Sequence, residues 1–220
     1  MKKVAVILCG SGYRDGSEIR ESVATLWALS QARAQVQCFA PDGLQADVVN
    51  CLTGEVVPHE KRNMLVESAR IARGDVKPLT DLKVEHFDAL IIPGGFGAAK
   101  NLCSFAQKGS GGSVLPELKR VVQGFFDNKK PIGAICIAPA ILALALPSKN
   151  LTLTVGESGE TSQEIENLGH RHQITRVTDC CVDSSHRVVT TGAYMFGSAA
   201  LHDVFSGIQK CVQAVLDLIP

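Results

Sequence analysis

The stretch Pro131-Ile132-Gly133-Ala134-Ile135-Cys136-Ile137-Ala138-Pro139-Ala140 decides the fold. Small and apolar residues lead directly into a thiol, and residues that are compatible with a helix follow at once. A sharp turn from a buried strand into a helix is typical of a nucleophile elbow, in which the side chain at the turn stands above the sheet. We therefore expect Cys136 at the carboxyl end of a strand in an α/β protein.

Short apolar runs of the same kind recur on both sides of this stretch, and segments with helical periodicity separate them. We expect strands at 4–8, 36–40, 89–92, 131–136, 151–157 and 188–191. We expect helices at 17–32, 64–71, 118–126, 161–169 and 201–219. This alternation predicts an open α/β sandwich, with a mostly parallel sheet and helices on both faces. The Gly- and Ser-rich segment 108–113 is predicted to be a mobile surface loop.

Composition narrows the class of protein. The 220 residues suggest a single domain, 1–220, and the net charge of zero argues against nucleic acid as a partner. The eight Cys include no C-x-x-C pair, and His170 and His172, with no third ligand in view, are expected to be solvated rather than metal-bound, so no metal site is expected. The sequence shows neither a membrane span nor a complete signal peptide. We therefore expect a soluble, reduced, cytoplasmic protein.

Two turns that follow strands could serve the thiol. A helix that begins after Cys136 favours the thiolate and would lower the pKa of the thiol, and the amide of Ile137 would point to a forming oxyanion. The turn Pro93-Gly94-Gly95-Phe96-Gly97 leaves the Gly95 amide free as a second donor. The alternatives are a buried structural Cys136 and a turn that needs glycine for geometry alone.

Two acids open the first predicted helix, and each is a candidate partner for the thiol. Glu18 and Glu21 could simply complement the helix dipole. Helical rotation places Glu21 among small and apolar residues, so burial would raise its pKa and keep it protonated. A protonated Glu21 could move a proton to or from a bound carbonyl. The sequence does not decide which of the two acids is the partner.

Taken together, four long blocks resemble the ElbB-type (ES-type) branch of the PfpI/class I glutamine-amidotransferase-like superfamily. They are 15–21, 62–74, 93–102 and 136–140. The resemblance runs nearly end to end and implies a flavodoxin-like sandwich, with Cys136 at the elbow and Glu21 as the partner acid. It also implies an oxyanion hole from the Gly95 and Ile137 amides, and frequently a homodimer. Bacterial members of this branch are described as cofactor-independent glyoxalases that convert glyoxal to glycolate, and they carry an older association with isoprenoid biosynthesis.

Amidotransferases and PfpI-type peptidases place a base His at the end of the strand after the elbow. The segment 151–157 has no His, which argues against both activities. The leading hypothesis is therefore a glyoxalase-like lyase, without a cofactor, that acts on a small carbonyl substrate through a Cys136 hemithioacetal. One alternative is a redox-sensing regulatory protein that uses the same reactive thiol. Another is dinucleotide binding at Gly10, Gly12 and Gly16, whose spacing departs by one residue from the usual fingerprint.

Overall fold

The computed structural model describes residues 1–220 and is built on a central sheet of seven strands. The strands are β1 (Lys3–Ile7), β2 (Gln35–Ala40), β5 (Val76–Pro78), β6 (Ala89–Ile92), β7 (Ile132–Ile135), β10 (Cys181–Asp183) and β11 (Val188–Thr191). Their order is β10-β11-β7-β6-β1-β2-β5, and every neighbouring pair is parallel except β10 with β11. The predicted flavodoxin-like α/β fold with a mostly parallel sheet is confirmed.

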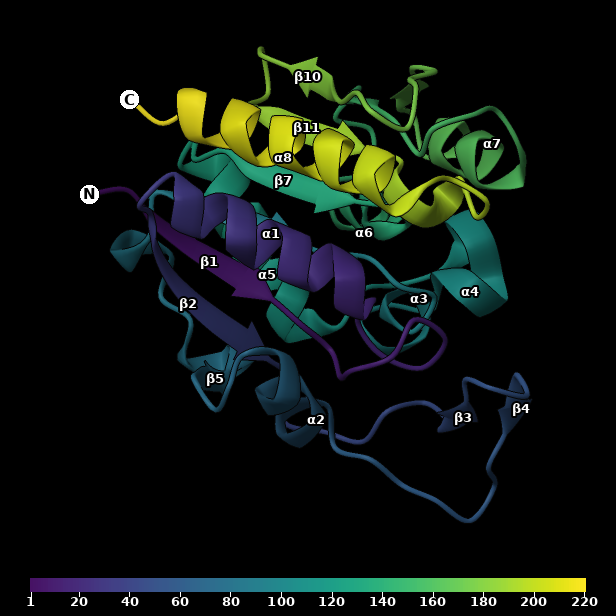
Figure 1. Ribbon diagram of the computed structural model, residues 1–220. Helices are drawn as coiled ribbons and strands as arrows, with labels where there is room; N and C mark the ends of the chain where they lie inside the picture. The colour runs from purple at the N-terminus through teal and green to yellow at the C-terminus, as the bar shows by residue number, and fades with distance from the viewer.

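Helices cover both faces of this sheet. In Figure 1, α1 (Ile19–Gln31) and α8 (Leu201–Asp217) lie side by side in front of the strands, and α5 (Pro116–Asp127) and α6 (Ala138–Ala145) lie behind them. The remaining helices are α2 (Met64–Ile71), α3 (Ala98–Asn101), α4 (Phe105–Lys108) and α7 (Glu160–Asn167). Short 3₁₀ turns span Leu79–Asp81, Val84–His86, Gly109–Gly111 and Ala193–Met195. None of the helices has both the length and the apolar character needed to cross a membrane.

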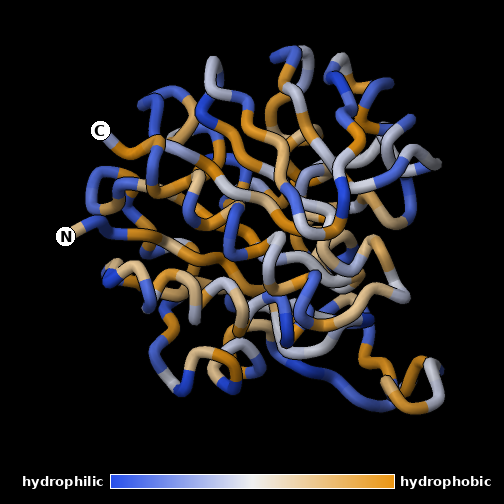
Figure 2. The backbone as a smooth tube through the Cα atoms, turned by 45° about the horizontal axis from the view of Figure 1, so that its top comes forward, coloured by the Kyte–Doolittle hydropathy of each residue, from blue (hydrophilic) through white to orange (hydrophobic).

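The hydrophobic core is continuous through both faces of the sheet. The central strands β1, β6 and β7 consist of buried apolar residues with almost no interruption. Figure 2 shows these hydrophobic segments in the interior of the chain trace, with hydrophilic segments mostly at its periphery. Burial on two faces explains why these strands lack the alternation of a sheet that is exposed to water on one side.

The carboxyl ends of the central strands meet at one edge of the sheet. The chain runs from β1 outward to β2 and β5, and then returns to β6 on the other side of β1. This reversal creates a switch point, where the loops after β1 and β6 diverge and leave a crevice. The elbow after β7 lies next to it, because β7 pairs with β6. The fold therefore brings together the turns that the sequence singled out.

Two local expectations were wrong. The segment 151–157 does not join the central sheet, because only β8 (Thr152–Leu153) is a strand, and it pairs with β9 (Arg171–His172). The predicted surface loop 108–113 contains the 3₁₀ turn Gly109–Gly111, and its Ser110 amide donates to the Glu164 carboxylate over 2.6 Å. Helix α7 begins earlier than expected, since the Ser162 hydroxyl accepts from the Gly159 amide and caps the helix there. A short antiparallel hairpin, β3 (Val49–Asn50) with β4 (Glu55–Val56), was not predicted.

Candidate functional site

Cys136 occupies the turn between β7 and α6, and its backbone has the left-handed conformation expected of an elbow. Its φ angle is +63°, which is unfavourable for a residue that carries a Cβ. The turn is held because the Cys136 amide donates to the carbonyl of Thr191, at the end of β11, over 2.8 Å. The residue keeps 7% of its surface exposed. Cys136 is therefore a nearly buried thiol rather than a freely exposed one.

Glu21 lies in the first turn of α1 and is fully buried against the elbow. Its Oε2 lies beside Cys136, since a Cβ added at Gly94 would meet both this oxygen and the Cβ of Cys136. Its Oε2 accepts from the Gly94 amide over 3.1 Å, and its Oε1 accepts from the Tyr194 amide over 3.2 Å. This one carboxyl group therefore joins the loop after β6, the turn after β11 and the nucleophile elbow.

The two acids at the start of α1 make different contacts. Glu18 caps α1: its Oε2 accepts from the Glu21 amide over 2.6 Å, and its own amide donates to the Gly94 carbonyl over 2.9 Å. Glu18 therefore positions the backbone of both Glu21 and Gly94. The acid that contacts the thiol is Glu21.

Burial sets the protonation of the thiol and the acid. Burial, and then the charge of Glu18, raise the pKa of Glu21 from 4.5 to about 8, although the thiol and the two amides oppose this. Burial and the charge of Glu21 raise the pKa of Cys136 well above that of an ordinary thiol. The expected lowering of the thiol pKa is therefore wrong, because desolvation outweighs the donors of the turn. The expected protonated Glu21 is supported.

Two backbone amides favour a negative charge at the elbow. The backbone amides of Gly95 and Ile137 both act to lower the pKa of the Cys136 thiol. The loop that carries Gly95 is tightly packed. A Cβ on Gly94 would lie 2.5 Å from the Cβ of Cys136 and 2.8 Å from Oε2 of Glu21. Gly95 itself has a φ of +105°, so both positions require glycine.

Tyr194 is a site residue that sequence reasoning missed. Besides its amide contact with Glu21, its hydroxyl accepts from the Arg20 guanidinium over 3.2 Å. That guanidinium also lies 6.0 Å from the centroid of the Tyr194 ring. The available signal was position, because Tyr194 follows β11 at the sheet edge where β6 and β7 also end.

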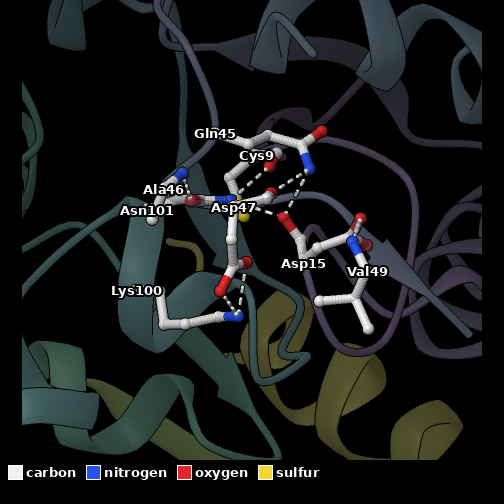
Figure 3. Close-up of polar contacts among 8 residues, drawn as sticks. All are labelled: Cys9, Asp15, Gln45, Ala46, Asp47, Val49, Lys100 and Asn101. Atoms are coloured by element: carbon white, nitrogen blue, oxygen red, sulfur yellow. Dashed lines mark hydrogen bonds and ion pairs between the residues drawn. The ribbon is translucent and has the colours of Figure 1, made fainter. Parts of the chain in front are cut away.

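A buried polar cluster lies next to the two glycine-rich loops that follow β1 and β6. The Asn101 side chain donates to the carbonyls of Cys9 and Asp15 and accepts from the Ala46 amide, over 3.1, 2.8 and 2.8 Å (Figure 3). One Asp15 carboxylate oxygen accepts from the Val49 amide over 2.9 Å. These bonds tie the segment that carries β3 to the loop after β1. That loop in turn packs against Gly97, where a Cβ would collide with the backbone of Asp15 and the following residue.

The glycine-rich loop after β1 is used for packing within the protein. The Gly10 amide donates to the Ser68 hydroxyl, the Gly12 amide to the Ser17 carbonyl and the Gly16 amide to the Gly12 carbonyl. None of the three glycine amides is left for a phosphate group. This arrangement removes the geometric basis for dinucleotide binding at this loop.

The histidines lie away from the thiol. His170, expected to be solvated, is buried: its Nδ1 accepts from the Leu151 amide and its Nε2 donates to the Ala143 carbonyl. His172 accepts from the Val155 amide. The groups that act on Cys136 are Glu21 and backbone amides, with no imidazole among them.

Comparison with known proteins gives a consistent picture. The DJ-1/PfpI family model matches residues 2–200. Two relatives are 43% identical over 98% of this chain: "ES1 protein homolog, mitochondrial" of Rattus norvegicus and "Glutamine amidotransferase-like class 1 domain-containing protein 3, mitochondrial" of Homo sapiens. The chain covers 84% and 83% of their lengths. A crystal structure of an isoprenoid biosynthesis protein with an amidotransferase-like domain, from Ehrlichia chaffeensis, is 38% identical and covers both chains fully, with a TM-score of 0.93.

These relatives correct one expectation. Both mammalian proteins are named as mitochondrial, and this finding contradicts the cytoplasmic location predicted from the sequence.

Proposed function

This chain belongs to the DJ-1/PfpI family, in its ES-type branch, and from its site we propose a cofactor-independent glyoxalase-type activity. The substrate is a small 2-oxoaldehyde and the product is the corresponding 2-hydroxy acid. Cys136 is the nucleophile, Glu21 carries protons, and the Gly95 and Ile137 amides form the oxyanion hole. We further propose that residues 1–220 act as one domain.

In the first step, the thiol adds to the aldehyde carbon. A carbon–sulfur bond forms, the ionised form of Glu21, which is present near its pKa of about 8, accepts the thiol proton, and the carbonyl oxygen becomes an oxyanion. The Gly95 and Ile137 amides stabilise this oxyanion, in keeping with their lowering effect on the pKa of the Cys136 thiol. Protonation of the oxyanion by Glu21 completes the hemithioacetal.

In the second step, the proton moves between adjacent carbons. The ionised Glu21 removes the proton from the hemithioacetal carbon, which gives an enediolate. The hydroxyl proton on that carbon passes to the neighbouring oxygen, and Glu21 returns its proton to the neighbouring carbon. The result is a thioester of the hydroxy acid on Cys136. Water hydrolyses the thioester, releases the acid and restores the thiol. Overall, one 2-oxoaldehyde and one water give one 2-hydroxy acid, and no external oxidant or reductant is needed.

The observation that carries this proposal is the fully buried Glu21, whose pKa is raised to about 8 and whose side chain contacts the elbow thiol. A proton carrier with a pKa close to the working pH is efficient in both directions. A glutaminase or a peptidase would instead need an imidazole base at the thiol. The groups around Cys136 include none.

Turnover of glyoxal to glycolate tests the proposal, with wild type, Cys136→Ala and Glu21→Gln compared. We expect both variants to lose at least about a hundredfold in kcat, since each removes a group that forms or breaks bonds. Cys51→Ala is the matched control, because Cys51 is exposed on the β3–β4 hairpin, and it should retain wild-type turnover. Equal glycolate production by wild type and Cys136→Ala would refute the proposal.

The redox-sensing alternative predicts a different result from the same samples. Mild peroxide followed by intact-mass measurement would then add oxygen selectively at Cys136, while glyoxal turnover stays at the level of Cys136→Ala. Turnover that depends on Cys136 and Glu21 favours the enzyme.

The family resemblance also leads us to propose a homodimer. Apolar side chains that are about half exposed gather on the adjacent helices α1 and α8, namely Ile19, Val23, Trp27 and Leu201. Exposed apolar groups of this kind are typical of interaction surfaces. Sedimentation equilibrium of wild type and Trp27→Glu tests this point, with a loss of dimer expected for the variant.

A further inference from the structure

A cavity of about 290 Å³ opens beside the candidate site. One wall is formed by Phe96 and Ile137, the residues that directly follow Gly95 and Cys136. The two amides proposed to hold the oxyanion therefore lie at the border of this cavity. The cavity is therefore space next to the elbow that could receive the substituent of a carbonyl held by those amides.

The volume of the cavity exceeds what the smallest substrate needs. Glyoxal has four non-hydrogen atoms, and at about 30 Å³ for each water-sized group it needs about 120 Å³. More than half of the cavity would then remain unfilled. Helix α4 lines this space with Phe105 and Ala106, so part of its surface is apolar and suits a hydrocarbon group.

The charges around the cavity exclude one kind of substituent. Helix α7 contributes Glu160 and Glu164, against the single cation Lys108. The Ser110 hydroxyl and amide lower the pKa of Glu164, which keeps this carboxylate ionised. A carboxylate or phosphate on the substrate would face net negative charge here.

We propose that this cavity receives the substituent of a 2-oxoaldehyde larger than glyoxal, with an uncharged apolar or aromatic group and no carboxylate or phosphate. The proposal rests on the proposed function, since it places the reacting carbonyl at Cys136. It deepens that function by assigning a class of substrate.

The test compares kcat/KM for glyoxal, phenylglyoxal and 4-carboxyphenylglyoxal in wild type and Ala106→Phe. We expect wild type to prefer phenylglyoxal over its carboxylated analogue by about tenfold or more, because the two differ only in the charged group. Ala106→Phe fills the cavity, and we expect it to lower kcat/KM for phenylglyoxal at least about tenfold more than for glyoxal. A ratio that does not change in the variant would overturn the assignment.

A second pair of variants examines the charge. Glu164→Gln keeps an oxygen that can accept from the Ser110 amide and removes the negative charge, so kcat/KM for 4-carboxyphenylglyoxal should rise severalfold. Glu166→Gln is the matched control, because Glu166 is exposed on the same helix and outside the cavity, and it should change nothing.

Binding of acetophenone separates this inference from the proposed function. Acetophenone has the ring and a carbonyl but no aldehyde, so saturation-transfer NMR reports occupancy of the cavity without turnover. We expect binding to wild type and its loss in Ala106→Phe. Turnover of glyoxal without acetophenone binding overturns the cavity assignment alone. Acetophenone binding without turnover of any aldehyde overturns the proposed function, and with it the assignment of the cavity to an aldehyde substrate.

Discussion

Replacing Glu21 by Gln should change how the stability of the protein depends on pH. In the unfolded chain this carboxyl titrates near 4.5, whereas in the folded protein burial raises its pKa to about 8. Between these values the folded state keeps a proton that the unfolded state has lost. The free energy of unfolding therefore falls as pH rises, by about 1.4 kcal/mol per unit and by about 5 kcal/mol over the whole interval. The stabilisation is complete below pH 4.5 and is lost as pH rises through 8.

The measurement is urea unfolding of wild type and Glu21→Gln at pH 5, 6, 7 and 8. Gln leaves an amide group facing one of the two backbone donors, Gly94 or Tyr194, and this mismatch lowers stability equally at every pH. The free energy of unfolding of wild type minus that of the variant should fall by about 3.5 kcal/mol from pH 5 to pH 8, since titration is incomplete at both ends. Glu85→Gln, at an exposed position, should show no such trend. A difference that stays constant within about 1 kcal/mol would refute the burial argument.

Three further outcomes are expected. Gly94→Ala should abolish glyoxal turnover and lower the free energy of unfolding in urea by about 2 kcal/mol or more, because the added Cβ collides with Cys136 and Glu21. Gly111→Ala is the control: its added Cβ would meet no atom within 4 Å, so neither turnover nor stability should change. Asn101→Ala should cost about 2–4 kcal/mol of stability in the same assay, because three buried hydrogen bonds are lost. Iodoacetamide at pH 7 should modify the exposed Cys51 first and Cys136 slowly, as followed by peptide mass spectrometry; faster alkylation of Cys136 would contradict its raised pKa.

Much of the fold was predictable because its central strands are short, continuous apolar runs bounded by glycine or proline. The predicted bounds of α2, β6 and β11 agree with the structure to the residue. Those segments are bounded by strong local signals, such as the Asn63 cap of α2 and the Pro93 that follows β6. The short strands β3, β4 and β9 were missed, and only β8 remains of the strand predicted at 151–157, since two-residue strands are specified by tertiary contacts rather than by periodicity.

The site was predictable in position but not in its electrostatics. Cys136, Gly95 and Ile137 were found because parallel strands bring their carboxyl ends to one edge. Glu21 was chosen from helical rotation, which correctly indicated its burial. The direction of the thiol pKa was wrong, because a local sequence shows the helix dipole but not the depth at which neighbouring segments enclose the sulfur.

We take the raised pKa of Cys136 as support for the proposed enzyme over the redox sensor. A redox sensor depends on a thiolate that is present at rest, and a buried thiol beside an acidic group supplies little of it. An enzyme has no such requirement. In the enzyme, the thiol of Cys136 gives its proton to an ionised Glu21 when a carbonyl lies between the Gly95 and Ile137 amides. The negative charge then moves from the Glu21 carboxylate to the carbonyl oxygen beside these amides. Because this charge was already buried, no new charge has to be desolvated. The pair is therefore suited to a nucleophile that ionises in the presence of its substrate, and for this reason the environment of Cys136 favours catalysis over sensing.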